Sequence, residues 1–220
     1  MGDNTHEDAE IAALRKEYAA GGITESDLAA DPVAMFARWF DDVREANLHE
    51  PNAMVVATVS ESGHPSSRMV LLKGFGDDGF RFFTNTTSRK GRELATNPAC
   101  SLLFPWHLLE RQVRIDGIAS LLPRADVEDY FGVRPRGSRL GAWASHQSQP
   151  VSGRDELDAA YGEVEARFRD DEEVPVPEAW GGYLVRPEVV EFWQGRPGRM
   201  HDRLVYRRTR DGWVTQRLAP

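Results

Sequence analysis

Apolar residues recur at helical spacing in the first fifty residues of the chain. They fall three or four positions apart in one series formed by Ile11, Leu14 and Tyr18, and at similar spacing in a second series between residues 35 and 43. Asp31 and Pro32 precede the second series. This pair is typical of a helix start, because aspartate accepts hydrogen bonds from free amides and proline fits the first helical position. The pattern predicts helices within residues 1–50.

From residue 54 the pattern changes to short runs of valine, phenylalanine, threonine and leucine separated by turn residues. Such runs predict strands, which we place at 54–60, 66–75, 80–85, 99–106, 112–122, 181–193, 202–208 and 212–218. Residues 88–96 and 157–168 predict helices, and the acidic, proline-containing segment 170–177 predicts a loop. Because the strands do not alternate with helices, we expect an α+β fold built on a mainly antiparallel β-barrel with peripheral helices.

Composition narrows the class of protein. The chain has 220 residues, of which 40% are hydrophobic and 28% charged. This length is enough for one domain with a substantial core. No apolar run approaches the roughly 18 residues of a membrane span, and the acidic N-terminus has no apolar signal segment, so we expect no membrane partner. The single cysteine, Cys100, excludes an internal disulfide and is typical of a cytoplasmic protein.

The charge is unevenly distributed along the chain. Residues 51–150 carry 12 basic and 9 acidic side chains, although the formal net charge of the whole chain is −8. Nucleic-acid binding depends on neutralisation of phosphates by a basic surface, so we expect no nucleic-acid partner. A basic region within an acidic chain favours a local pocket for small anions.

Two familiar motifs are excluded. Residues 74–79 match the dinucleotide fingerprint G-x-G-x-x-G, but the residues that follow predict a strand rather than the helix that the fingerprint requires, so we expect a hairpin turn. The six histidines have no H-x-x-x-H or H-x-H spacing, and no G-x-S-x-G is present, which argues against a zinc site and a serine nucleophile.

Three basic clusters are candidates for anion binding. Arg68 and Lys73 lie five positions apart in one expected strand, which places them on opposite faces. Residues 86–90 place hydroxyls and cations at an expected helix start, where free amides favour a phosphate. Residues 130–138 contain two arginines, a tyrosine and a serine. Two solvated strand charges are an equally good interpretation of the first cluster, and an ordinary capped surface helix of the second, so each cluster alone is a weak signal.

Residues 190–203 differ in kind from these clusters. They combine Trp193, Arg196, Arg199 and His201, which supply a stacking surface, fixed positive charge and a group that titrates near neutrality. A structural strand does not require that mixture. The pattern favours an anionic aromatic ligand.

The same segment carries a family resemblance. Residues 191–203 match the signature E-F-W-Q-x-x-x-x-R-[LIVM]-H-D-R throughout, and the chain resembles the pyridoxamine 5′-phosphate oxidases over nearly its whole length. Further motifs follow in the family's order: RMVLLK at 68–73, SRK at 88–90, SLLFPW at 101–106, ERQVR at 110–114, R-P-R at 134–136, GAWASHQS at 141–148 and RLAP at 217–220. The resemblance implies a split β-barrel homodimer that carries FMN at the subunit interface.

The resemblance also implies roles for individual residues. It assigns FMN contacts to Arg68, Met69, Val70, Leu71, Leu72, Lys73, Phe83, Thr84, Arg89, Lys90, Gln112, Gln147, Ser148, Trp193 and Arg203. It assigns the substrate phosphate to Lys73, Tyr130, Arg134 and Ser138, and the ring end to Arg199, Met200 and His201. Arg199 and His201 are the implied catalytic residues, while Arg15 and Tyr18 match N-terminal residues that fold over the substrate.

The implied reaction is oxidation of pyridoxine 5′-phosphate and pyridoxamine 5′-phosphate to pyridoxal 5′-phosphate. Its acceptor is O2, it releases H2O2, and the amine also yields ammonia. Residues 1–50 would then form a helical segment that can act as a lid, and residues 51–220 the FMN-binding barrel of a single domain. The chain departs from the family at Phe83, where tyrosine is common, at Met200, which replaces leucine, and at Lys16, which replaces arginine.

Two alternatives remain. One is a split-barrel flavoenzyme with another substrate, as in the phenazine-pathway relatives, although joint retention of the substrate-site residues argues against it. The other is a non-catalytic carrier of flavin or vitamin B6, which binding residues alone do not exclude.

Overall fold

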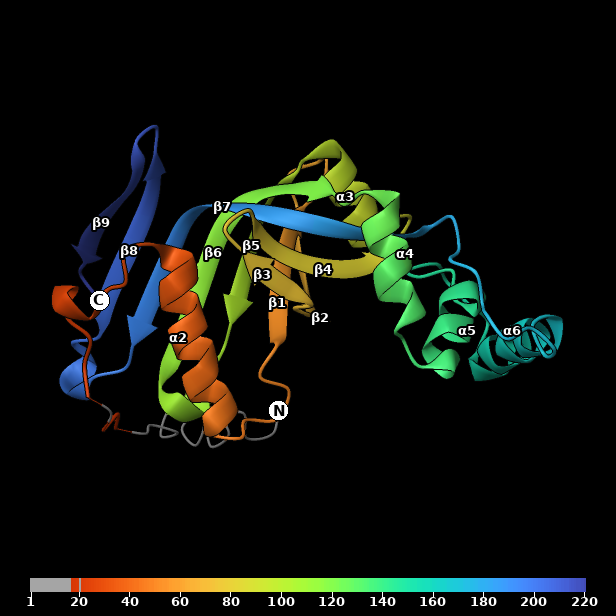
Figure 1. The fold of residues 1–220 in the computed structure, drawn as a ribbon, viewed down its shortest axis with the longest axis horizontal. Helices are drawn as coiled ribbons and strands as arrows, with labels where there is room; N and C mark the ends of the chain where they lie inside the picture. The colour runs from red at the N-terminus through yellow and green to blue at the C-terminus, as the bar shows by residue number, and fades with distance from the viewer. Residues whose placement is uncertain (1–16, 20) are drawn as a thin grey trace, which may run out of the picture.

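The computed structural model describes residues 17–19 and 21–220. This part of the chain forms one antiparallel nine-stranded sheet in the order β2-β1-β5-β6-β7-β4-β3, with β8 paired to β7 and β9 to β8 (Figure 1). The strands are β1 (Ala53–Val59), β2 (Pro65–Leu71), β3 (Gly74–Gly76), β4 (Gly79–Asn85), β5 (Ala99–Phe104), β6 (Arg111–Leu121), β7 (Trp180–Gln194), β8 (Asp202–Thr209) and β9 (Gly212–Leu218). The sheet is curled, and helices lie around it.

The helices occupy different sides of the sheet. They are α2 (Pro32–Glu45), α3 (Arg89–Thr96), α4 (Arg124–Gly132), α5 (Arg136–Ala144) and α6 (Arg154–Arg167), with short 3₁₀ turns η1 (Glu25–Asp27), η2 (His107–Leu109) and η3 (Pro197–Arg199). Helix α2 crosses one face of the sheet, whereas α4, α5 and α6 lie at the end opposite β8 and β9 (Figure 1).

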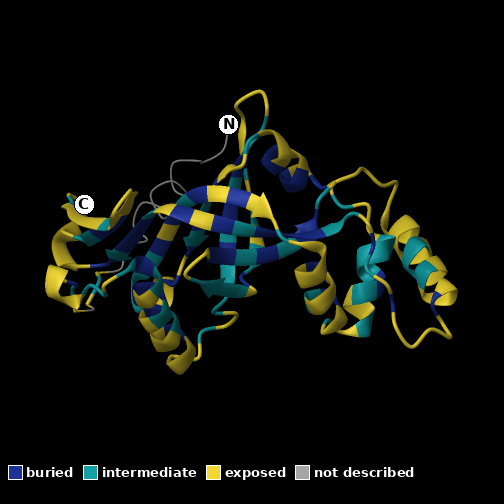
Figure 2. Cartoon of the chain, turned by 45° about the horizontal axis from the view of Figure 1, so that its top comes forward, coloured by how far each residue is buried: buried dark blue, intermediate teal, exposed yellow. Residues whose placement is uncertain are grey.

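The main core lies between α2 and the sheet. Phe36 on α2 makes edge-on ring contacts with Phe80 and Phe104 at centroid distances of 5.0 and 4.9 Å, and Trp39 makes one with Phe192 at 5.2 Å. Buried and exposed positions alternate along the strands, as expected for a sheet with one packed face (Figure 2). A second, smaller core joins α4 to α6 through Phe131, Leu140, Phe168 and Val174.

Strand β7 connects the two ends of the molecule. Its first residues, Trp180 to Val185, pair with β4, and its last, Val189 to Gln194, pair with β8. A strand rises about 3.3 Å per residue, so Trp180 and Trp193 at the two ends of β7 are separated by up to about 40 Å. Residues that belong to these two ends are therefore far apart in one chain.

Most of the predicted elements are confirmed. Asp31 accepts hydrogen bonds from the amides of Val33 and Ala34 at 2.8 and 2.9 Å and begins α2, and residues 76–79 form the hairpin turn between β3 and β4. Gly79 has φ +140°, and a Cβ there would meet the Val185 carbonyl oxygen at 2.2 Å, so this turn requires glycine.

Two expectations are wrong, and two helices were not predicted. The expected strand 66–75 is interrupted after Leu71, so Lys73 lies between β2 and β3, where its amide donates to the Arg81 carbonyl at 2.8 Å. Tyr18 is not helical. Helices α4 and α5, which follow Pro123 and Pro135, were not predicted, because each has only 9 residues and buries one or two side chains, too few to define a helical spacing.

The described residues contain no candidate for a membrane-spanning helix or for a metal site built from histidine, cysteine and carboxylate side chains. None of their helices is both long and apolar enough to cross a membrane. Within the same residues, no three histidine, cysteine, aspartate or glutamate side chains form a group that could hold a metal ion.

Candidate active site

A cavity of about 380 Å³ lies between the sheet and helices α3, α4 and α5. We call it the helix-side pocket. Its lining consists of Met69, Val70, Leu71, Lys73, Phe83, Thr84, Lys90, Tyr130, Arg134, Pro135, Ser138, Gln147 and Trp180. All of these except Pro135 and Trp180 are residues that the family resemblance assigns to FMN or substrate. Residues from β2, β4, β7, α3, α4, α5 and the connections between elements thus converge on one cavity.

Arg134 is the least satisfied cation of this pocket. Its guanidinium lies 4.1 Å from the Trp180 ring centroid and 5.4 Å from that of Phe131, and its Nη1 is buried without a hydrogen-bond partner among the described residues. Burial lowers the pKa of Arg134, while nearby Tyr130 raises it. A buried guanidinium donor without an acceptor is costly unless a ligand supplies one, and a phosphate oxygen is a suitable acceptor.

Aromatic rings form one wall of the pocket beside these cations. Phe83 and Tyr130 stack with centroids 3.9 Å apart, and the Lys73 Nζ lies 5.9 Å from the Tyr130 centroid. Phe83, the position where tyrosine is common, therefore keeps the stacking surface without a hydroxyl. Lys73 and Ser138 are exposed at the rim, where both can reach an anion.

Lys90 lies deeper in the pocket. Its buried Nζ donates to Gln147 Oε1 at 2.7 Å and to Thr84 Oγ1 at 3.0 Å, and no described carboxylate is paired with it. Burial, with repulsion from Arg68, lowers the pKa of Lys90 to about 8. Behind it, Arg68 and Arg89 share the buried carboxylate of Glu93.

A second group of assigned residues lies around Trp193 at the end of β7. We call Tyr18, Trp193, Arg199, Met200 and His201 the Trp193 cluster. The rings of Tyr18, Trp193 and His201 contact one another at centroid distances of 4.7–5.7 Å. Arg199 and Met200 are exposed, and Arg199 has a left-handed backbone with φ 61°. A non-glycine residue in that conformation is strained, and such strain is common at functional sites.

His201 has a defined tautomer in this cluster. Its Nδ1 accepts a hydrogen bond from the Arg196 amide at 3.1 Å. An accepting Nδ1 carries no proton, so the neutral ring carries its proton on Nε2 and can donate there. Tyr18 reaches this ring because the next amide, that of Ala19, donates to the Glu110 carboxylate at 3.0 and 3.2 Å.

Arg203 and Gln112 lie next to the Trp193 cluster. Both face Trp193 across adjacent strands, Arg203 in the β7–β8 register and Gln112 in the β6–β7 register. The buried carboxylate of Glu191 accepts from Arg203 at 2.8 and 3.0 Å and from Arg114 at 3.0 Å. These hydrogen bonds raise the pKa of Arg203. The cation is therefore held in place by a carboxylate.

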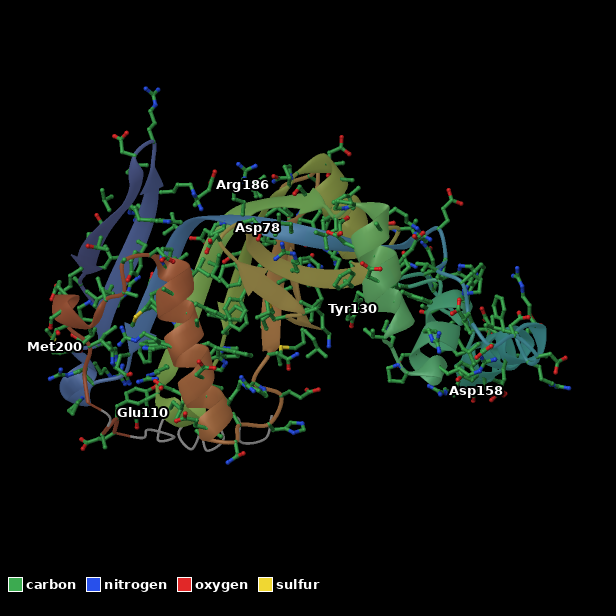
Figure 3. The ribbon with its side chains drawn as sticks, viewed as in Figure 1. Asp78, Glu110, Tyr130, Asp158, Arg186 and Met200 are labelled. Carbon is green, nitrogen blue, oxygen red and sulfur yellow. The ribbon has the colours of Figure 1, made fainter. Side chains whose placement is uncertain are left out.

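The helix-side pocket and the Trp193 cluster do not meet in one chain. Met200 of the cluster lies at the end of the molecule that carries β8 and β9, whereas Tyr130 of the pocket lies beside α4, towards the end that carries α5 and α6 (Figure 3). Of the remaining assigned residues, Leu72 packs in the core, Ser148 has φ 70° beside Gln147, and Arg15 lies outside the described residues.

Comparison with known proteins decides the family. A model described as pyridoxamine 5′-phosphate oxidase matches residues 40–168, and one described as the pyridoxine 5′-phosphate oxidase C-terminal dimerisation region matches residues 180–220. The pyridoxine/pyridoxamine 5′-phosphate oxidase of Nocardioides sp. (strain ATCC BAA-499 / JS614) is 67% identical over 211 residues, which cover 96% of this chain and 98% of that one. The chain belongs to the pyridoxamine 5′-phosphate oxidase family.

Solved structures agree with this assignment. PhzG from Burkholderia lata 383, in complex with tetrahydrophenazine-1-carboxylic acid, superimposes with a TM-score of 0.83 at 32% identity over 89% of this chain and 95% of that one. A pyridoxamine 5′-phosphate oxidase-related, FMN-binding protein from Nostoc punctiforme PCC 73102 superimposes with a TM-score of 0.68 at 19% identity, over 88% and 98%. The expected split-barrel fold, family and enzyme class are therefore confirmed.

The pyridoxamine 5′-phosphate oxidase fold also contains groups that sequence reasoning missed. Glu93 pairs with Arg68 of β2 and Arg89 of α3, Glu191 pairs with Arg114 of β6 and Arg203 of β8, and Trp180 covers Arg134. One local signal was available, since Glu93 follows Arg89 by four residues, the spacing of a helical ion pair. The pairing of Glu191 with Arg203 depends on strand register and has no local signal.

Proposed function

We propose that the protein oxidises pyridoxine 5′-phosphate and pyridoxamine 5′-phosphate to pyridoxal 5′-phosphate, with FMN as cofactor and O2 as acceptor. The reacting carbon loses one hydrogen with two electrons, the attached oxygen or nitrogen loses a proton, and O2 gains both electrons and both protons to give H2O2. The amine substrate also takes up water and releases ammonia. The observation that carries the proposal is the helix-side pocket, in which Lys73, Tyr130 and Ser138 line the same cavity as Arg134, whose Nη1 has no acceptor among the described residues.

The residues present fit a flavin phosphate. Arg68, Arg89 and Lys90 converge at the start of α3, and the buried ammonium of Lys90 has hydroxyl and amide partners but no described carboxylate. Segment 69–71, Phe83, Thr84 and Gln147 would border the rest of the cofactor. When bound, FMN supplies a two-electron acceptor that O2 can reoxidise. The chain supplies binding, orientation and charge.

The substrate residues divide into two tasks. Lys73, Arg134 and Ser138 would hold the substrate phosphate, because fixed cations and a hydroxyl form strong bonds with its oxygens. Arg199 and His201 would hold the ring end, with the His201 Nε2 proton available to a ring substituent. Placing the reacting carbon correctly is the main catalytic contribution of such residues.

Because the residues for these two tasks lie far apart within one chain, we propose that two copies of the chain form each site. The Trp193 cluster lies mostly within residues 180–220, which match the dimerisation region. In the homodimer, the cluster of one protomer would then face the helix-side pocket of its partner. Tyr18, which contacts Trp193 and His201, would bring the N-terminal segment to the same site.

Anaerobic mixing of the FMN-loaded protein with each phosphorylated vitamer tests the proposal. We expect the flavin absorbance to bleach with either vitamer and to return when oxygen is admitted. A flavin that stays oxidised with both vitamers would contradict the proposed substrates. Bleaching by a reduced phenazine carboxylate alone would support the alternative that the PhzG structure represents, and no bleaching by any of them would support a carrier.

A further inference from the structure

Glu93 is one of two buried carboxylates among the described residues, and it lies beneath the proposed phosphate end of the cofactor site. It is 6% exposed. Its Oε1 accepts from Arg89 Nε at 2.9 Å, four residues earlier on α3. Its Oε2 accepts from Thr58 and Ser66 hydroxyls at 2.5 and 2.6 Å and lies 3.4 Å from Arg68 Nη2. Glu93 therefore joins α3 to strands β1 and β2.

The hydrogen bonds of this group can run in only one direction. Arg68 donates to the Thr58 hydroxyl at 2.6 Å and to the Ser66 hydroxyl at 2.5 Å. Each hydroxyl has a single proton, and an ionised Glu93 can only accept. The chain of donation therefore runs from Arg68 through both hydroxyls to Glu93, and the guanidinium has one favoured orientation.

The charges favour the same arrangement. Burial by itself would raise the pKa of Glu93, but hydrogen bonds from Ser66, Thr58 and Arg89 outweigh it and lower the pKa to about 2. Glu93 thus stays ionised across the physiological pH range. It is the only described carboxylate paired with Arg68 or Arg89, so the three cations Arg68, Arg89 and Lys90 keep a positive surplus that suits a phosphate.

We infer that Glu93 is a positioning residue that fixes Arg68 and Arg89 as a pair for the cofactor phosphate. It acts through the two arginines and does not itself contact the cofactor. The inference rests on the proposed FMN site. Preorganised charges bind an anion more tightly than mobile ones, because the ordering of long side chains has taken place before binding.

A charge effect alone makes the opposite prediction. Removing an anion beside three cations raises the local positive potential and would strengthen phosphate binding. A structural effect alone would lower the stability of the fold and weaken all ligands to a similar degree. The sign of the change and its dependence on the phosphate therefore separate the three explanations.

The test compares FMN with riboflavin, which lacks the phosphate, in titrations of the flavin-free protein followed by flavin fluorescence. We expect Glu93→Ala to weaken FMN binding about tenfold or more, with riboflavin affinity changed less than about twofold. Glu93→Gln should recover most of the loss, because its amide oxygen still accepts from both hydroxyls. Asp158→Ala is the matched control: it removes an exposed i,i+4 pair with Arg154 of the same 2.9 Å length on α6, and should change neither affinity.

Several results would overturn the inference. Unchanged or tighter FMN binding by Glu93→Ala would do so, as would equal losses for FMN and riboflavin. If Glu93→Ala does not fold, as judged by its melting temperature, Ser66→Ala replaces it, since this variant cuts one link between Arg68 and Glu93 and should weaken FMN alone. A wild-type protein that binds FMN no better than riboflavin would instead remove the proposed cofactor, and this inference with it.

Discussion

The helix-side pocket and the Trp193 cluster use their charged groups in different ways. In the pocket, Arg134 Nη1 has no described acceptor and Lys90 has no described carboxylate. In and around the cluster, Arg203 is held by Glu191, and Arg196 is paired with Asp202 at 3.3 Å. The pocket therefore has charge available for a ligand, whereas most of the charge beside the cluster is already neutralised.

The two regions also differ in enclosure. Helices α3, α4 and α5 surround the pocket, whereas Arg199 and Met200 project from a short turn at the end of the sheet, where Met200 is 69% exposed. An enclosed cationic pocket can bind an anion within one chain. An exposed turn with a strained arginine needs a second surface to enclose a substrate. The difference supports our proposal that the pocket supplies affinity and the cluster supplies orientation once two copies associate.

The largest expected effect comes from the charges of the pocket. The double variant Arg89→Ala, Lys90→Ala removes two cations, and each lost charge-assisted bond costs about 1.5–3 kcal/mol. The dissociation constant of FMN should therefore rise at least about a hundredfold, as measured by flavin content after purification and by titration. Arg154→Ala, an exposed arginine of α6, is the control and should keep full flavin content. A double variant that purifies with all its flavin would refute the assignment.

A substitution in the Trp193 cluster should lower turnover and leave FMN binding unchanged. Arg199→Ala should leave FMN bound but lower kcat/KM by about a hundredfold or more, because this side chain is proposed to hold the reacting substrate and not the cofactor. Flavin absorbance and steady-state turnover, measured on the same sample, separate the two effects. Unchanged kcat/KM would show that the cluster has no part in orientation, and loss of flavin would show that the regions do not divide the work as proposed.

A heterodimer that combines one variant of each region tests whether the pocket of one protomer and the cluster of its partner form a shared site. Arg134→Ala and Arg199→Ala should each be nearly inactive as homodimers. A heterodimer purified through two different tags contains one site with both defects and one intact site, so it should recover about half of the wild-type activity per dimer. Activity no higher than the mean of the two homodimers would show that each site lies within one chain.

The sequence predicted local features better than the arrangement of these regions. Most strands and helices, the Asp31 cap and the 76–79 turn depend on neighbouring residues and were predictable, whereas α4, α5 and the break after Leu71 were not predicted. The family motifs named most pocket residues, but spacing could not show that Trp180 covers Arg134 or that Glu191 holds Arg203, because these contacts are set by strand register and by packing of distant segments. The separation of the two regions likewise became visible only from the length and pairing of β7.

The smallest expected effect is the pH dependence of FMN affinity in the helix-side pocket. Burial lowers the pKa of Lys90 to about 8, so in the flavin-free protein the ammonium loses its charge as pH rises through that value. FMN affinity should therefore fall several-fold between about pH 7 and pH 9, while riboflavin affinity stays level. Lys90→Arg keeps its charge over this range and should flatten the profile. An equal decline in Lys90→Arg would show that Lys90 is not the pH-sensitive group.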